Sequence, residues 1–371
     1  MNIGFDGKRA TQNLTGLGNY SRYLIRLLTI LYPENKYLVY TLKNPSSGMA
    51  IKDVVYKYPG NQLFKSYWRS KSVVNDLIRD KIDLFHGLSN EIPFGLKSAG
   101  IPSVVSIHDL IFIRYPQYYS FIDRAIYKLK FRHAAQKADK IIAISEQTKN
   151  DLIQFLGVSE ESIEVIYQDC DPMFHQSVAS SVNAEIKERY TLPDKYILNV
   201  GTIEERKNLM LIVKALLEVP DIHLVVVGRE TSYSQKVRQF IKENKLHERV
   251  HLLQNVAYLD LPAIYQQAEL FIYPSRFEGF GIPVVEALHS GVPVIAAKGS
   301  CLEEAGGPES IYVDPDDELE MADQIKNVLD NDEKRIKMVS AGREYLNKFD
   351  SKRISGQLTQ LYQNVINNAK R

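Results

Sequence analysis

Residues 271–297, FIYPSRFEGFGIPVVEALHSGVPVIAA, decide the fold of this chain. An apolar run leads into a loop with two glycines, a short amphipathic stretch follows, and a second apolar run ends the segment. Pro283 suits the first position of a helix, and Gly291 suits the residue just past its end. The order therefore predicts strand, loop, helix and strand, which is the repeating unit of a parallel α/β sheet.

The same alternation of short apolar runs and longer amphipathic stretches extends along the whole chain. The predicted strands are residues 2–5, 36–41, 84–86, 102–107, 140–144, 196–200, 223–227, 250–252, 270–273 and 292–296. The predicted helices are residues 19–31, 72–81, 121–138, 146–156, 209–217, 234–243, 260–267, 283–289 and 318–327. This pattern predicts an α/β fold with two doubly wound domains, and in such sheets ligands bind at the carboxyl ends of the strands.

A polar, weakly periodic stretch at residues 171–194 separates the two series of elements. We interpret it as a linker between domains. An N-terminal domain would then cover residues 1–175 and a C-terminal domain residues 190–350. Two such domains would face each other across a cleft.

Composition and charge narrow the class of protein. With 371 residues, 44% of them hydrophobic and 25% charged, the chain has the balance of a globular protein, and no apolar run is long enough to span a membrane. No secretory signal precedes the first predicted strand, so we expect a cytoplasmic protein. Two cysteines, Cys170 and Cys301, exclude a disulfide framework and any metal site built from cysteines.

The two halves of the chain differ in charge. Residues 1–150 hold 22 Lys and Arg against 11 Asp and Glu, and the remaining residues hold 24 against 34. A basic first half suggests contact with something anionic, such as a phosphorylated acceptor, a lipid diphosphate or a membrane surface. Attraction between two oppositely charged domains is the alternative. We find no nucleic-acid-binding module.

The loop at residues 276–282 combines features of an anion site and of a sugar site. Gly279 and Gly281 let the backbone approach a ligand closely, and the amides of the following helix N-terminus attract a diphosphate. Glu278 and Glu286 flank this element, and carboxylates accept hydrogen bonds from paired sugar hydroxyls. The arrangement suits a nucleotide-sugar. Alternatively, Glu286 only complements the helix dipole and Glu278 is solvated.

The segment EGFGIPVVE, with its Pro-Ser before the loop and Gly-x-Pro-Val after the helix, resembles the E-x7-E element of glycosyltransferase family 4. The resemblance covers nearly the whole chain and implies retaining, metal-independent enzymes with the GT-B fold, in which two Rossmann-like domains face each other. It implies that Glu278 contacts the donor hexose and Glu286 the ribose, that Gly279, Phe280 and Gly281 line the donor site, and that the last helix, at about residues 351–371, packs on the first domain.

Further donor residues follow from the segment GTIEERKN at 201–208, which comes after a predicted strand. Arg206 and Lys207, behind the turn at Gly201, would clamp a diphosphate. An exposed basic pair is the alternative, but the resemblance implies the phosphate role. It also assigns Gly228 to the donor pocket and the backbone around Val256 to the nucleobase, although a glycine after a strand is often only a turn.

The first half contributes residues that follow strands as well. Gly16 and Gly18 form a GxG loop, but no glycine follows where the dinucleotide fingerprint needs its third one, which disfavours a dehydrogenase. The resemblance implies that this loop meets the donor phosphates. It also implies that His108 orients or polarises the transferred sugar, and that Asp109 and His86 lie on the acceptor side. As a lone histidine, His108 would more often be structural.

The segment from Arg114 to Lys140 is rich in basic and aromatic residues, and Lys65, Trp68, Arg69 and Lys71 form a second such cluster. An amphipathic basic helix can lie on an anionic membrane, so peripheral contact with a membrane or a lipid-linked acceptor is one hypothesis. An ordinary solvated helix that packs by its aromatic face is the other.

These features predict a retaining glycosyltransferase that moves a hexose from a nucleoside-diphosphate sugar to a hydroxyl of a glycan or lipid-linked acceptor in cell-surface polysaccharide synthesis. GTIEERKN resembles the mannosyltransferase-like branch, so GDP-mannose is the first donor and a UDP-sugar the second. No metal or other cofactor is expected. A nucleotide-sugar epimerase of the same fold and a catalytically silent binding protein are the alternatives. Residues 167–171 depart from the family, which usually has an Asn-Gly pair there.

Overall fold

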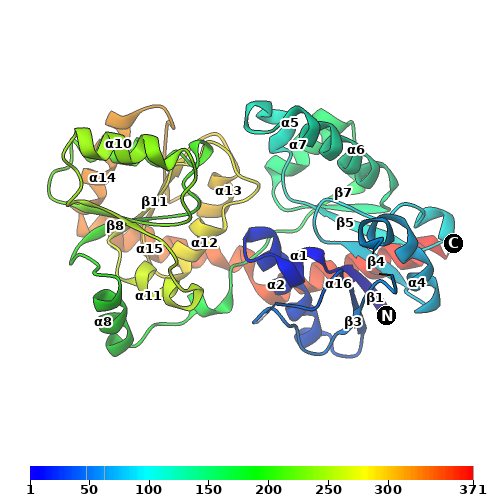
Figure 1. Ribbon diagram of the computed structural model, residues 1–371. Coiled ribbons are helices and arrows are strands. Elements are labelled where there is room, and N and C mark those ends of the chain that lie inside the picture. The colour runs from blue at the N-terminus through cyan, green and yellow to red at the C-terminus, as the bar shows by residue number, and fades with distance from the viewer. Residues whose placement is uncertain (47, 62, 371) are drawn as a thin grey trace. The chain divides into compact units, whose positions relative to one another are not determined.

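The computed structural model describes residues 1–46, 48–61 and 63–370, and the chain divides into two compact units (Figure 1). The first unit combines Met1–Gln168 with Phe349–Arg371, and the second is Asp169–Lys348. Each unit contains one parallel β-sheet with helices packed around it. The predicted α/β class with two doubly wound domains is confirmed.

The sheet of the first unit has the strand order β3-β2-β1-β4-β5-β6-β7. These strands are β1 (Asn2–Asp6), β2 (Lys36–Tyr40), β3 (Val55–Lys57), β4 (Leu84–Gly87), β5 (Ser103–Ile107), β6 (Lys140–Ala143) and β7 (Ile163–Val165). The helices are α1 (Lys8–Gln12), α2 (Gly16–Leu31), α3 (Lys65–Tyr67), α4 (Val73–Arg79), α5 (Ile111–Arg114), α6 (Phe121–Lys137), α7 (Glu146–Leu156) and α16 (Ser351–Ala369).

The sheet of the second unit has the order β10-β9-β8-β11-β12-β13. These strands are β8 (Tyr196–Val200), β9 (His223–Val227), β10 (Val250–Leu253), β11 (Leu270–Tyr273), β12 (Val294–Ala297) and β13 (Ile311–Val313). The helices are α8 (Ser180–Arg189), α9 (Leu209–Ala215), α10 (Ser234–Glu243), α11 (Leu261–Gln266), α12 (Ile282–His289), α13 (Leu302–Gly306), α14 (Glu318–Leu329) and α15 (Asp332–Tyr345).

Both sheets reverse their strand order next to the first strand of the unit, between β1 and β4 and between β8 and β11. Such a reversal opens a crevice at the carboxyl ends of the strands, which is where doubly wound sheets bind ligands. The central strands of both sheets are buried and largely apolar, as parallel strands covered on both faces must be. No helix within the described residues is long and apolar enough to cross a membrane.

The predicted linker at residues 171–194 is wrong. The division between the units lies between Gln168 and Asp169, and most of the predicted linker is the helix α8 with a short 3₁₀ turn (Pro172–His175) before it. Helix α8 looks like a linker in sequence because it is largely exposed and buries mainly Ile186. The short edge strands β3, β7 and β13 and the helix α15 were also not predicted.

Candidate functional site

The loops that follow the strands of the second unit meet at one edge of its sheet. Because β8, β9, β10 and β11 are all parallel, their carboxyl ends lie side by side. The loops after these strands carry most of the donor-site residues that the sequence predicts. The fold therefore gathers segments that lie up to 80 residues apart in the sequence, roughly what a βαβαβ half-domain spans.

One carboxylate oxygen organises this edge. Oε1 of Glu278 lies 2.8 Å from Nη1 of Arg206 and 3.2 Å from Nζ of Lys207. It also accepts hydrogen bonds from the hydroxyls of Tyr273, at 3.0 Å, and Ser275, at 2.8 Å. Two cations and two hydroxyls thus surround one carboxylate. Tyr273 and Ser275 were not predicted, although the Tyr-Pro-Ser sequence before the loop contains both.

The charges of this cluster stabilise one another. Burial alone would raise the pKa of Glu278, but the charges of Lys207 and Arg206 and the hydrogen bonds from Ser275 and Tyr273 lower it to about 2. Burial favours the neutral form of Lys207, yet Glu278 holds the pKa of this lysine above its usual range. All three groups are therefore charged at neutral pH, and the carboxylate of Glu204, 2.6 Å from Nη2 of Arg206, adds a second acidic group to the cluster.

The backbone around the cluster is held tightly. A Cβ on Gly228 would lie 1.9 Å from the carbonyl oxygen of Gly201, so this glycine allows the loops after β8 and β9 to touch. Gly201, with φ of +153°, lies against the side chain of Lys207. Gly281 has φ of +124° and precedes α12. These glycines serve the close packing of the loops.

Buried contacts support the loop from Glu278 to Gly281. Gly279 and Phe280 are buried, and the thiol of Cys301 donates to the carbonyl oxygens of Glu278 and Phe280, each at 3.0 Å. Val256 lies in the loop after β10 and is half-buried. It follows Asn255, which has a positive φ of 56°.

Glu286 lies on α12, after the loop that holds Glu278, and has a different environment. Its Oε2 accepts a hydrogen bond of 2.9 Å from the hydroxyl of Tyr265 on α11. Burial raises the pKa of Glu286 to about 7, and the charge of Asp171 adds to the rise, whereas the hydrogen bond from Tyr265 opposes it. This carboxyl group therefore changes its charge near neutral pH. Tyr265 was not predicted.

In the first unit, His108 follows β5 and is buried. Its Nε2 lies 2.9 Å from the carbonyl oxygen of Leu88, so this nitrogen carries the proton and Nδ1 is the acceptor. The rings of His108 and Tyr20 of α2 lie nearly perpendicular, with centroids 4.6 Å apart. Burial lowers the pKa of His108 to about 4, so the imidazole is neutral at neutral pH. Asp109 accepts a hydrogen bond from the amide of Ile111 at the start of α5.

His86 does not lie where the prediction of an acceptor contact needs it. The residue is fully buried in β4. Its Nδ1 lies 2.6 Å from the hydroxyl of Tyr362 on α16, and its Nε2 lies 2.9 Å from Oγ of Ser106. Both ring nitrogens are thus occupied inside the unit. His86 connects the sheet to the C-terminal helix, and an acceptor role for it is wrong.

The glycine loop at the start of α2 combines one required and one replaceable glycine. A Cβ on Gly18 would lie 1.8 Å from the carbonyl oxygen of Asn13, whereas a Cβ on Gly16 would meet open space. The guanidinium of Arg22 donates to the carbonyl oxygens of Ala10 and Asn13. Arg22 therefore fixes the loop before α2.

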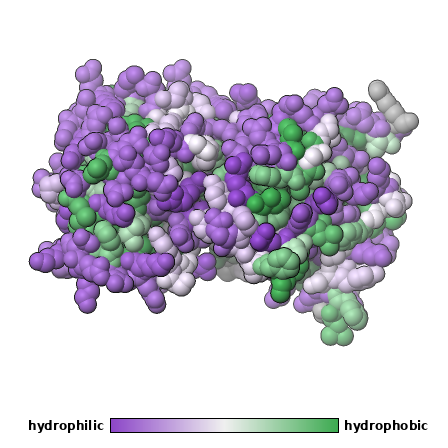
Figure 2. Space-filling view, turned by 90° about the horizontal axis from the view of Figure 1, so that it is seen from above, coloured by the Kyte–Doolittle hydropathy of each residue, from purple (hydrophilic) through white to green (hydrophobic). Residues whose placement is uncertain are grey.

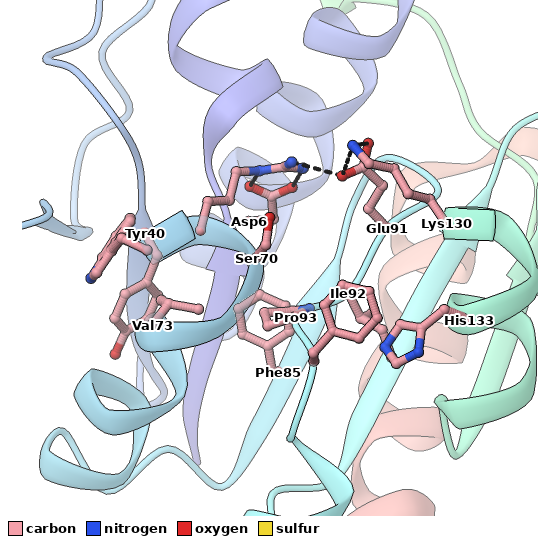
Figure 3. A pocket seen from close by; sticks show the side chains of 13 residues that line it. Asp6, Tyr40, Ser70, Val73, Phe85, Glu91, Ile92, Pro93, Lys130 and His133 are labelled. Atoms are coloured by element: carbon pink, nitrogen blue, oxygen red, sulfur yellow. Dashed lines mark hydrogen bonds and ion pairs between the residues drawn. The ribbon is translucent and has the colours of Figure 1, made fainter. Parts of the chain in front are cut away.

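A pocket of the first unit was not predicted (Figure 3). Asp6, the last residue of β1, pairs with Arg69 through two hydrogen bonds, of 3.0 and 2.5 Å. Arg69 also contacts Glu91 at 2.7 Å, and Lys130 lies 3.2 Å from the same carboxylate. The feature of the sequence that could have indicated this pocket is Asp6, an acidic residue at the end of the first strand.

The two basic-aromatic clusters are only partly exposed. Tyr119, Tyr127 and Phe131 pack against one another or against Phe112. Trp68 is buried, and the side chain of Arg69 is only 14% exposed. Trp68 and Arg69 therefore present little surface to a membrane. Helix α6 nevertheless exposes apolar side chains between its lysines and arginines; these are Phe121, Ile122, Ile126 and Leu129. Figure 2 shows hydrophobic side chains on the surface of this unit, seen from above.

Comparisons with known families support an assignment. Residues 17–172 match the model described as Glycosyltransferase Family 4, and residues 182–345 match the model described as Glycosyl transferases group 1. The two matches fall on the two units of the structure and together take in most of the chain.

Similar proteins include two that are named O-antigen chain mannosyltransferases. The O-antigen chain mannosyltransferase RfbU of Salmonella typhimurium is 28% identical over 66% of this chain, which spans 65% of that protein, less than two thirds. The O-antigen chain mannosyltransferase B of Escherichia coli is 26% identical over 77% of this chain and 75% of its own length. D-inositol 3-phosphate glycosyltransferase of Corynebacterium glutamicum is 23% identical over 90% of this chain and 83% of its own length.

Solved structures agree on the fold. Anabaena HepE, crystallised with UDP and glucose, has a TM-score of 0.77 and 19% identity over 98% of this chain and 99% of its own. WaaG, a glycosyltransferase involved in lipopolysaccharide biosynthesis, has a TM-score of 0.70 and 16% identity over 98% of this chain and 99% of its own. The predicted GT-B fold is confirmed.

Proposed function

This chain belongs to the group 1 glycosyltransferases of family 4, and we propose that it transfers a hexose from a nucleoside-diphosphate sugar to a hydroxyl of a glycan or lipid-linked acceptor. One observation carries the proposal. Arg206 and Lys207 surround Glu278 at the strand ends of the second unit, where a doubly wound sheet binds its ligand.

The cluster supplies charge stabilisation for a leaving nucleoside diphosphate. Arg206 and Lys207 would contact the diphosphate and stabilise the negative charge that develops on it as the glycosidic bond breaks. Two protein cations do here what a metal ion does in other transferases, so we propose that the reaction needs no metal. Arg206 presents a planar fork to the phosphate oxygens, and Lys207 a point charge.

The two carboxylates have separate tasks in this proposal. Glu278, ionised beside the cations, accepts hydrogen bonds from hydroxyls of the hexose. Glu286, on α12, accepts them from the ribose diol, and Val256 offers backbone groups to the base. The transfer would retain the anomeric configuration, with the leaving phosphate helping to deprotonate the acceptor on the same face.

We propose GDP-mannose as the donor and a UDP-sugar as the second candidate. The segment GTIEERKN and the two O-antigen mannosyltransferases among the similar proteins support mannose. The same relatives support a role in polysaccharide synthesis. HepE was crystallised with UDP and glucose, and this supports the UDP-sugar as the second candidate donor.

We assign the acceptor to the first unit. His108 is neutral and has an acceptor nitrogen, so it can orient a sugar hydroxyl, and Asp109 follows it. Gly16 and Gly18 open α2, whose N-terminal amides suit an anionic group. The ion pairs of Asp6, Arg69 and Glu91 line a pocket of the same unit.

A screen of nucleotide-sugars, followed by a transfer assay, tests the proposed donor and reaction. Thermal shifts with GDP-, UDP- and ADP-sugars identify the base, and transfer of a labelled sugar to lipid-linked acceptors in membrane extracts, with NMR of the product anomer, identifies the reaction. Conversion of the donor without an acceptor would instead indicate an epimerase, and tight binding without turnover a silent binding protein. Glu286→Ala with donor binding and turnover intact would refute the site.

Helix α6 leads to a second, smaller proposal, that the first unit contacts an anionic membrane at its surface. Exposed Ile122, Ile126 and Leu129 recur every three to four residues, with Lys128 and Arg132 beside them. We expect Ile122→Ser with Leu129→Ser to weaken sedimentation with phosphatidylglycerol vesicles, but not Leu319→Ser, which changes an exposed leucine of the second unit. Equal sedimentation of both variants would contradict the contact.

A further inference from the structure

Four potential metal ligands meet at the beginning of the second unit. Asp169, Cys170 and His175 come from one short segment, and His289 comes from the last turn of α12. One ligand atom from each lies within 4.8 Å of all the others. The count of two cysteines excludes a site built from cysteines, but a mixed site needs only one.

The distances approach those of a tetrahedral site. Nε2 of His289 lies 2.9 Å from Oδ1 of Asp169, and Nε2 of His175 lies 3.4 Å from Oδ2 of the same carboxylate. Sγ of Cys170 lies 3.7 Å from Nε2 of His175. A tetrahedral zinc ion with bonds of about 2.0–2.3 Å separates its ligand atoms by about 3.3–3.7 Å. The separations of these ligand atoms are therefore close to those that the ion needs.

The two histidines stack on each other, so one ring must rotate before both Nε2 atoms can face one ion, because a metal lies near the plane of each imidazole that binds it. Their rings lie parallel, with centroids 3.7 Å apart and an angle of 14° between the planes. Both present Nε2 to the same carboxylate. These contacts to Asp169 hold the two histidines together.

The donor set selects the kind of metal. A thiolate, a carboxylate and two neutral imidazoles carry two negative charges, which balance a divalent cation in a largely buried position. Sulfur and imidazole nitrogen favour zinc over magnesium or calcium, which prefer oxygen. Asp169 and Cys170 are buried, whereas His175 is about one-third exposed and leaves a path for the ion.

We propose that Asp169, Cys170, His175 and His289 bind a Zn²⁺ ion. Four protein ligands fill a tetrahedral zinc site, so the ion is structural and takes no part in sugar transfer. It joins the first residues of the second unit to α12, one turn beyond Glu286. Asp169 and Cys170 lie in the segment that departs from the Asn-Gly pattern of the family.

Zinc binding by the full-length protein tests this inference. After treatment with a chelator, the protein is titrated with Zn²⁺ in competition with a chromophoric chelator. We expect one ion per chain with a Kd below about 1 µM, and a higher Tm with Zn²⁺ but not with Mg²⁺. Co²⁺ in the same site should give the intense visible bands of tetrahedral coordination and a near-ultraviolet thiolate band.

Variants separate this site from other histidines. Cys170→Ser should remove the thiolate band and, like His289→Gln, weaken zinc binding at least tenfold, while the metal-free variants melt within a few degrees of the metal-free wild type. His247→Gln, which changes an exposed histidine of the same unit, should bind zinc as the wild type does. Absence of stoichiometric zinc binding by the wild type, or equal binding by all three variants, would overturn the proposal.

Discussion

Glu278 lies in the loop before α12, and Glu286 lies on that helix. Both are largely buried, yet their pKa values shift in opposite directions. Glu278 has two cations and two hydroxyls around one oxygen, and its pKa falls to about 2. At Glu286 burial raises the pKa to about 7, the negative charge of Asp171 adds to the rise, and the hydrogen bond from a tyrosine hydroxyl opposes it only in part. Neighbouring charges, and not depth, decide which carboxyl group is ionised.

The difference has a consequence for ligand binding. The cluster at Glu278 is charged before any ligand arrives, so it is ready for a diphosphate at any pH near neutral. The pocket at Glu286 must lose a proton before its carboxylate can accept two hydroxyl hydrogen bonds. Binding of the ribose should therefore depend on pH, whereas binding of the diphosphate by protein cations should not.

Removal of a cation from the charged cluster should have the largest effect. Arg206→Ala removes the planar guanidinium and leaves Lys207 as the cation beside Glu278, so the affinity for GDP should fall on the order of 100-fold. Isothermal titration measures it. Lys214→Ala, which removes a cation paired with Glu318 outside the cluster, is the matched control and should change affinity less than about twofold. Equal affinities in the two variants would break the comparison.

Glu286 should make the second unit less stable as the pH rises. Its pKa is raised from 4.5 to about 7, so the folded state holds a proton that the unfolded state has lost. The protonated carboxyl group therefore contributes fully to the free energy of unfolding below pH 4.5. This contribution, on the order of 2–3 kcal/mol, is lost as the pH rises through 7. Glu286→Gln should melt without this dependence. Parallel melting temperatures of variant and wild type between pH 5 and pH 8 would contradict the raised pKa.

Donor binding at pH 6 should release up to about one proton, because the ribose diol binds the ionised form of Glu286. Calorimetry with GDP-mannose in two buffers of different ionisation enthalpy counts the protons, and this donor has no phosphate that titrates near neutral pH. Glu286→Gln should release almost none. Release that is unchanged in the variant would assign the proton to another group.

The smallest effect should come from the tyrosine hydroxyls. Tyr273→Phe removes a hydrogen bond to Glu278 and a contact of 2.6 Å with Lys207, so GDP-mannose affinity should fall by about 1 kcal/mol without a change in pH dependence. Tyr265→Phe should instead raise the pKa of Glu286 and move the pH dependence upward. If both variants shifted the pH profile alike, the two carboxylates would not be independent.

The sequence predicts local patterns better than contacts between distant segments. The stretch at residues 271–297 contains its strand, loop, helix and turn residues in order, so fold and site were visible there. Tyr265 reaches Glu286 only because α11 packs beside α12, and no local pattern announces that contact. His86 follows the same strand-end pattern as His108, but packing against α16 occupies it. Helix α8 buries too little to show a helical period.

The most direct test of the account is the affinity of Glu278→Gln for GDP and for GDP-mannose, measured side by side by calorimetry. The substitution removes the charge that competes with the diphosphate for Arg206 and Lys207, and it weakens the contact with the hexose. The account predicts that GDP binds as tightly as to the wild type or more tightly, while the added affinity from the mannose disappears. An equal loss for both ligands, or no change for either, would contradict the assignment of Glu278 to the sugar.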